Sequence, residues 1–116
     1  MKLMTKPIGL ALLAAAANQD VLEKLPEHQR PIIVKYFTPD AQCSWFIMDG
    51  TQEDDDWRLF GLCDLGMGTP ELGYVMLSDL ESIRGHLRLP VERDGHWTGT
   101  LADARRVLRS MFGDPQ

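Results

Sequence analysis

The segment Phe60–Asp94, with the sequence FGLCDLGMGTPELGYVMLSDLESIRGHLRLPVERD, decides the fold of this chain. It predicts the end of one strand, a Gly-rich turn, a strand over Glu71–Met76, and then a helix. The helix is expected to begin at the capping-box pattern Ser78–Glu81, in which the first side chain caps the helix and the glutamate bonds back to it. Four apolar residues fall on one side of that helix: Leu77, Leu80, Ile83 and Leu87.

Three stretches upstream of this segment are rich in β-branched and aromatic residues, which is typical of strands. They are Pro31–Phe37, Cys43–Asp49 and Trp57–Cys63. A Thr-Pro-Asp turn at residues 38–40 separates the first two, and the acidic loop Gly50–Asp56 joins the last two into a hairpin. Together with Glu71–Met76, they predict a small, mostly antiparallel sheet of three to four strands.

The hairpin allows a register to be proposed. If its loop is centred near Glu53, Trp45 lies opposite Gly61, and an aromatic ring over a cross-strand glycine is a recurrent device in sheets. The same register places Cys43 opposite Cys63. Two interpretations of the cysteines stay open: they are small buried apolar groups, or they form a redox switch.

Helices are predicted at both ends of the chain. A first helix starts at Thr5–Pro7, since proline is tolerated at the first helical position, and its expected apolar stripe is Leu10, Leu13, Ala14 and Ala17. A further short turn begins at a second capping box, Asp20–Glu23. The last helix starts at Thr100–Asp103, with an apolar face of Leu101, Ala104, Leu108 and Met111 or Phe112.

These elements predict an α+β fold in which one sheet is packed with about three helices. At 116 residues the chain is expected to form a single domain, residues 1–116, with a core over residues 31–94. The net charge of -5 argues against a general duplex-binding protein, which would carry a basic face.

The cysteines and the apolar segments bear on the compartment. The two cysteines form no CxxC pair, and no histidine stands at metal-ligand spacing from either. The apolar run Ile8–Ala17 is too short to span a bilayer and lacks a signal-type cleavage context. We therefore expect a cytoplasmic protein with reduced thiols, no membrane segment, and neither a metal nor another cofactor.

Several motifs, in this order, resemble a family of small bacterial proteins classed as a domain of unknown function, the one numbered 2958. They are KYFTPDAQCSWF, FGL, ELGY, LSDLE, RG and LPVERD, and they span Val34–Asp94. The matching positions are Phe37, Thr38, Pro39, Trp45, Phe60, Gly61, Leu62, Glu71, Leu72, Gly73, Tyr74, Leu80, Arg84, Gly85, Leu89, Glu92, Arg93 and Asp94. The chain departs from the pattern at Asp49, where glutamate is more usual, in its GTQEDDD loop and in its Ala-rich N-terminus. The resemblance implies residence on plasmids, integrative elements or phages, and it implies no reaction.

The candidate site residues form an acidic set with one arginine, all at predicted strand ends or turns: Asp49, Glu71, Glu92, Arg93 and Asp94. A small sheet could bring these carboxylates together. They would then bind a divalent cation, perform acid–base chemistry, form an ion pair with the arginine that stabilises a turn, or form a surface that binds a partner.

Aromatic residues offer a second kind of site. Trp97 follows an Asp-Gly-His turn and is expected to be the most exposed tryptophan, which makes it a candidate anchor for a protein partner. Tyr74 and other sheet aromatics could instead stack on single-stranded bases, with Arg58 and Arg93 nearby.

Three functions follow from these observations. The leading hypothesis is a non-enzymatic protein-binding or regulatory factor of a mobile genetic element, with a possible anti-defence role and a protein partner from the host or the element. The first alternative is an accessory single-stranded nucleic-acid-binding protein. The second is a small metal-dependent enzyme that uses the clustered carboxylates.

Overall fold

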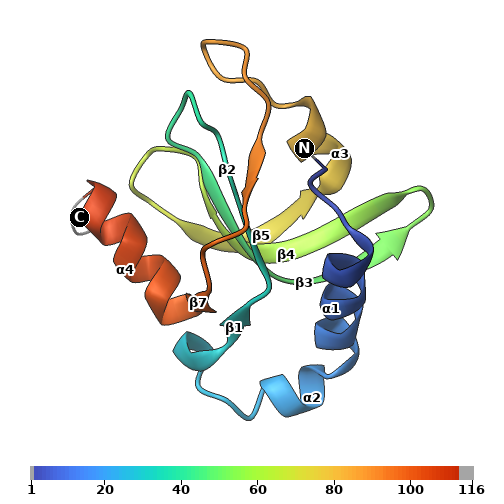
Figure 1. The fold of residues 1–116 in the computed structure, drawn as a ribbon. Helices are drawn as coiled ribbons and strands as arrows, with labels where there is room; N and C mark the ends of the chain where they lie inside the picture. Colours follow the sequence, from blue (N-terminus) through green and yellow to red (C-terminus); the bar gives the residue numbers. More distant parts are fainter. Residues whose placement is uncertain (1, 113–116) are drawn as a thin grey trace.

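The computed structural model, which describes residues 2–112, contains a five-stranded antiparallel sheet with helices on both faces (Figure 1). The strand order is β5-β4-β3-β2-β6. The strands are β2 (Val34–Phe37), β3 (Ser44–Glu53), β4 (Asp56–Asp64), β5 (Glu71–Met76) and β6 (Glu92–Asp94). A separate two-stranded sheet pairs β1 (Pro31–Ile32) with β7 (Gly99–Thr100).

The described residues also form four α-helices and one 3₁₀ helix. They are α1 (Lys6–Ala17), α2 (Gln19–Leu22), the 3₁₀ helix η1 (Glu27–Gln29), α3 (Leu77–Ser82) and α4 (Leu101–Phe112). The predicted α+β class is confirmed, although the sheet has more strands than the three to four expected. No helix within residues 2–112 is long and apolar enough to cross a membrane.

The core has two parts because side chains alternate across the sheet. Trp45, Ile47 and Leu59 point to one face, where α1 and α3 cover them. Phe46 and Leu62 point to the other face, where they pack against buried residues of α4. Figure 1 shows α1 and α3 on one side of the sheet and α4 on the other.

The predicted strand Pro31–Phe37 is divided at Ile33. Residues 31–32 pair with β7, whereas residues 34–37 pair with β3 and β6. The amide of Ile33 still donates to the carbonyl oxygen of Ile47 at 2.8 Å. One continuous extended segment therefore links the small sheet to the large one.

The predicted hairpin register was wrong. Trp45 lies opposite Cys63, and Ile47 lies opposite Gly61. The strands extend through most of the expected acidic loop to a two-residue turn between Glu53 and Asp56, and the ladder shifts again by a bulge between Ile47 and Asp49. The tight turn is possible because Asp54 adopts a positive φ of 54°, as short hairpin turns require.

The cysteines are therefore diagonal neighbours and do not face each other directly. Cys63 lies opposite Trp45, and Cys43 lies two residues before Trp45, just ahead of the start of β3. Both thiols are free and half-buried, and both pack against the core on the α1 side of the sheet.

Two predicted capping boxes were also wrong. Helix α3 begins at Leu77, and its N-cap position is Met76. The Ser78 hydroxyl instead donates to the Asp56 carboxylate at 2.5 Å, because the start of β4 lies beside it. Helix α2 begins at Gln19, ahead of the predicted Asp20, and its N-cap residue makes no side-chain capping bond. Leu87 lies beyond α3 and is exposed.

Helix α1 has the predicted start but a different buried face. Thr5 caps it by accepting a hydrogen bond from the amide of Ile8 at 3.4 Å. Gly9 and Leu12 are buried, whereas Leu10 and Leu13 of the expected stripe are exposed. A Cβ at position 9 would lie 3.1 Å from the Trp57 ring, so the glycine lets this face of the helix lie close to the sheet.

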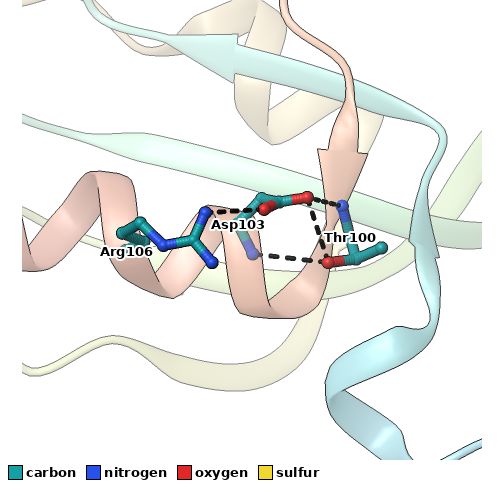
Figure 2. Close-up of polar contacts among 3 residues, drawn as sticks. All are labelled: Thr100, Asp103 and Arg106. Carbon is teal, nitrogen blue, oxygen red and sulfur yellow. Dashed lines mark hydrogen bonds and ion pairs between the residues drawn. The ribbon is translucent and has the colours of Figure 1, made fainter.

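The predicted start of α4 is confirmed, and Figure 2 shows its cap. The Asp103 carboxylate accepts from the Thr100 amide at 2.8 Å and from its hydroxyl at 3.1 Å, while the Asp103 amide donates back to that hydroxyl at 3.4 Å. Arg106 donates to the same carboxylate at 2.8 Å. The buried face consists of Leu101, Ala104 and Leu108. Met111 is exposed, and the side chain of Phe112 lies outside the described part.

Candidate functional site

The predicted carboxylate cluster does not form. Glu71 begins β5 and Glu92 begins β6, and these strands are the two opposite edges of the sheet. Neighbouring strands lie about 4.8 Å apart, so three intervening strands keep the two carboxylates far from each other. Within residues 2–112, no group of three or more His, Cys, Asp or Glu side chains could hold a metal ion.

At the β6 edge, the predicted residues are integrated into the sheet. Glu92, Arg93 and Asp94 are all half-buried. The Asp94 carboxylate forms an ion pair with Lys35 at 3.6 Å on the neighbouring strand. Arg93 lies opposite Tyr36. Burial raises the pKa of Tyr36 to about 12, and the positive charge of Arg93 opposes this rise.

Asp49 occupies a third, separate place, under α2. Its carboxylate accepts a hydrogen bond from the side-chain amide Nε2 of Gln19 at 3.3 Å. Burial raises the pKa of Asp49, against the opposing effects of the Arg30 charge and of this hydrogen bond. The geometry is that of a half-buried carboxylate that attaches α2 to the sheet.

The expectation that Trp97 is exposed was wrong. It is half-buried, and its ring packs edge-on against Phe46 with 5.1 Å between ring centroids and an interplanar angle of 68°. The turn before it directs the indole back to the α4 side of the sheet, where it joins the apolar core.

Tyr74 is the exposed aromatic residue of the predicted set. Its side chain is 62% exposed although it lies in a strand. The ring packs against Phe60 with 5.0 Å between centroids, and the Arg58 guanidinium lies 3.9 Å from the Tyr74 centroid. Phe60 and Arg58 belong to β4, so side chains of the neighbouring strand hold the Tyr74 ring in place.

A groove of about 310 Å³ brings Tyr74 together with Glu71. Two residues of the preceding loop, Leu65 and Met67, complete it and are 62% and 77% exposed. We refer to Leu65, Met67, Glu71 and Tyr74 as the Tyr74 surface. The other lining residues are Cys63, Thr69, Leu72 and Gly73.

The loop that carries Leu65 and Met67 is anchored by the last residue of β4. Asp64 is fully buried, and its carboxylate accepts a hydrogen bond from the amide of Gly66 at 3.2 Å. Gly66 and Gly68 both have positive φ values, 83° and 73°, which glycine adopts without strain. The intervening apolar side chains are thereby directed to the surface.

The chemistry of the groove favours binding. Burial raises the pKa of the Cys63 thiol above its ordinary value of 9.0, so at neutral pH the sulfur is protonated and weakly nucleophilic. The exposed groups around it are the apolar and aromatic side chains of Leu65, Met67 and Tyr74, the hydroxyl of Thr69 and the carboxylate of Glu71. Such a surface offers contact area and one charge to a ligand.

Sequence reasoning identified Glu71 and Tyr74 but missed Leu65 and Met67, because the Gly-rich sequence of residues 64–70 predicts only a turn. The sequence does contain a signal for the exposure of these two side chains. Two large apolar side chains in a Gly-rich turn do not follow the periodicity of a strand or helix, so the core does not require them.

Comparison with known proteins supports the predicted family. The model of the family described as "Protein of unknown function (DUF2958)" matches residues 3–104. The match therefore includes α1, which the sequence motifs had left outside the resemblance. Searches of curated proteins and of solved structures found no match. The chain belongs to the DUF2958 family of proteins of unknown function.

Proposed function

We propose that this protein is a non-enzymatic protein-binding factor that receives its partner on the Tyr74 surface. One observation carries the proposal: three large side chains, Leu65, Met67 and Tyr74, are each more than 60% exposed around one groove. Contiguous exposed apolar side chains are uncommon on monomeric proteins and typically mark an interaction site. Exposed aromatic residues are also frequent anchors of interfaces.

The distribution of acidic groups supports a binding role over a metal-dependent enzyme. Such an enzyme would need two or more carboxylates within reach of one ion. Glu71 and Glu92 lie on opposite edges of the sheet, and the Asp49 carboxylate already accepts a hydrogen bond from the Gln19 side chain. Among the described residues that line the groove, Glu71 alone carries a carboxylate.

The biological setting of the proposal rests on the family. We propose that the protein is encoded on a mobile element and acts in the cytoplasm on a protein of the host or of that element, with anti-defence as one such role. The two free, half-buried thiols suit a reducing compartment.

Affinity capture from a bacterial lysate, with and without nuclease, tests the proposal. The baits are the wild type, a double variant Met67→Ser/Tyr74→Ser, and a control Glu92→Gln at the opposite edge. We expect a stoichiometric protein, identified by mass spectrometry, that survives nuclease and is retained by wild type and control but lost with the double variant. Equal capture by all three baits would place the interface elsewhere.

A second candidate function has a specific observation in its favour. The stacked pair Arg58 and Tyr74 presents a cation and an aromatic face together, and this is the combination that binds single-stranded bases. Fluorescence anisotropy with a labelled oligo-dT, measured over a series of salt concentrations, tests it. Binding that weakens steeply with salt and is lost in Arg58→Gln would replace the protein-binding proposal, whereas we expect no binding because the net charge is -5.

A further inference from the structure

We infer that the partner docks as an extended β-strand that adds to the open edge of β5, with an apolar centre and a lysine or arginine at each end. This inference rests on the proposed function, because it specifies how the Tyr74 surface is used. It combines three observations: an open strand edge, a groove that surrounds that edge, and acidic groups at both of its ends.

The first observation is that β5 is an open edge. Within residues 2–112 it pairs with β4 on one side only. Exposed edges usually contain lysine, proline or closely spaced charges that prevent pairing with another chain. The opposite edge follows this rule, since β6 is only three residues long and reads Glu-Arg-Asp. In contrast, β5 has six residues, ELGYVM, and one charge.

The second observation is that the groove continues around this edge. Leu72 and Tyr74 point to the α4 side of the sheet, whereas Cys63 and Gly73 lie on the α1 side. All four line the same groove. A groove lined from both faces of an edge strand is open where a further strand would lie.

Gly73 supplies the space for an incoming side chain. A Cβ at this position would have no heavy atom within 4 Å. When a strand adds to a sheet edge, main-chain hydrogen bonds give affinity and pockets for alternate side chains give specificity. The space over Gly73 is such a pocket, and an apolar residue of the incoming strand would fill it next to Leu65.

The third observation is the charge at each end of β5. Glu71 is exposed at its start. Its far end meets the acidic hairpin tip, because Asp56 accepts hydrogen bonds from both the amide and the hydroxyl of Ser78. Asp79 follows in the first turn of α3. The nearby cation, Arg58, is paired with Glu53 at 3.7 Å.

This charge pattern determines which kind of strand can bind at the β5 edge. A segment with basic residues at both ends would be attracted to both ends of the edge. A second copy of this chain would be repelled, because antiparallel pairing of two β5 strands brings Glu71 of each copy towards the acidic end of the other. Six extended residues span about 20 Å, so a segment of this length covers the edge.

Selection of random ten-residue peptides displayed on phage tests the inference directly. The targets are the wild type, Gly73→Val, which fills the space over the groove, and Gly95→Val as the matched control. A Cβ at position 95 would also have no heavy atom within 4 Å, and neither glycine has a positive φ. Both variants should therefore fold, which thermal denaturation will verify.

We expect the enriched peptides to alternate apolar and polar residues between basic ends. Their affinity should fall at least tenfold in Gly73→Val and remain unchanged in Gly95→Val. Amide hydrogen exchange at β5 should slow when the peptide binds, and methylation of alternate peptide nitrogens should weaken binding at least tenfold. Glu71→Lys should shift the selected peptides away from a basic residue at that end.

The possible failures are distinguishable. Peptides that depend on Tyr74 but leave exchange at β5 unchanged, and that tolerate N-methylation, would overturn strand addition while retaining the Tyr74 surface as the binding site. The absence of any enrichment over Gly73→Val would overturn the inference too. The proposed function is tested separately, and it fails if partner capture does not depend on Met67 and Tyr74.

Discussion

Gly61 and Gly73 lie directly opposite each other on β4 and β5, but they are glycines for different physical reasons. A Cβ at position 61 would overlap the carbonyl oxygen of Phe46 on the neighbouring strand, whereas a Cβ at position 73 would meet open space. The first glycine permits the close approach of two strands beside the bulge. The second leaves the groove at the β5 edge empty.

This contrast predicts opposite effects of the same substitution. Gly61→Ala should lower the free energy of unfolding by about 3 kcal/mol or more, because the strands must separate to admit the methyl group. Gly73→Ala should raise it by roughly 0.5 kcal/mol, since alanine loses less backbone entropy on folding. Urea denaturation of both variants measures the difference, and equal effects would contradict this account of the pair.

A second prediction concerns the buried hydroxyl of Tyr36, which donates to the carbonyl oxygen of Leu3 at 2.5 Å. Tyr36→Phe should lower the free energy of unfolding by about 1 kcal/mol, because it leaves that carbonyl without its partner. Faster amide exchange in the N-terminal segment should accompany the loss. Unchanged stability at neutral pH would argue against the hydrogen bond.

The same residue predicts a dependence on alkaline pH. Burial raises the pKa of Tyr36 from 10.0 to about 12, so between these values the unfolded chain loses the proton that the folded protein retains. Stability from this group is present below pH 10 and is lost as the pH rises towards 12. The stability advantage of wild type over Tyr36→Phe should therefore shrink and then reverse as the pH rises from 9 to 12.

Asp49 should destabilise the protein at neutral pH. Burial raises its pKa, so the folded state favours the protonated carboxyl, and stability falls as the pH rises through the carboxylate range. Asp49→Asn retains an acceptor for Gln19 without the charge. We expect its advantage over wild type to grow from pH 4 to pH 7 in urea denaturation, with Asp79→Asn as an exposed control. A constant difference would show that the Arg30 charge cancels the effect of burial, and a reversed trend would show that it outweighs burial.

The cap of α4 gives a further prediction. Thr100→Ala should lower the free energy of unfolding by about 1 kcal/mol, because the amide of Asp103 loses its capping oxygen. Thr100→Ser retains the hydroxyl and should recover most of the loss. If alanine and serine behave alike, the helix end does not depend on this side chain.

Much of the fold could be predicted because its signals are local. The bounds of β5, Glu71–Met76, were predicted correctly, as were the caps at Thr5 and Thr100. Each depends on a few consecutive residues. Two of the failures were Ser78 and Trp97, whose side chains contact Asp56 and Phe46 on distant strands. The sequence order alone does not place those partners.

The candidate site likewise has a part that local sequence predicts and a part that it does not. The sequence by itself determined the α+β class, the family and the selection of Glu71 and Tyr74 as candidate site residues, because strand patterns and motifs depend on neighbouring residues. Only the tertiary structure decided that β5 is an edge, that Glu92 lies at the opposite edge, and that Leu65 and Met67 join Tyr74. Strand order depends on packing between residues far apart in the chain, so no local pattern specifies which edge remains open.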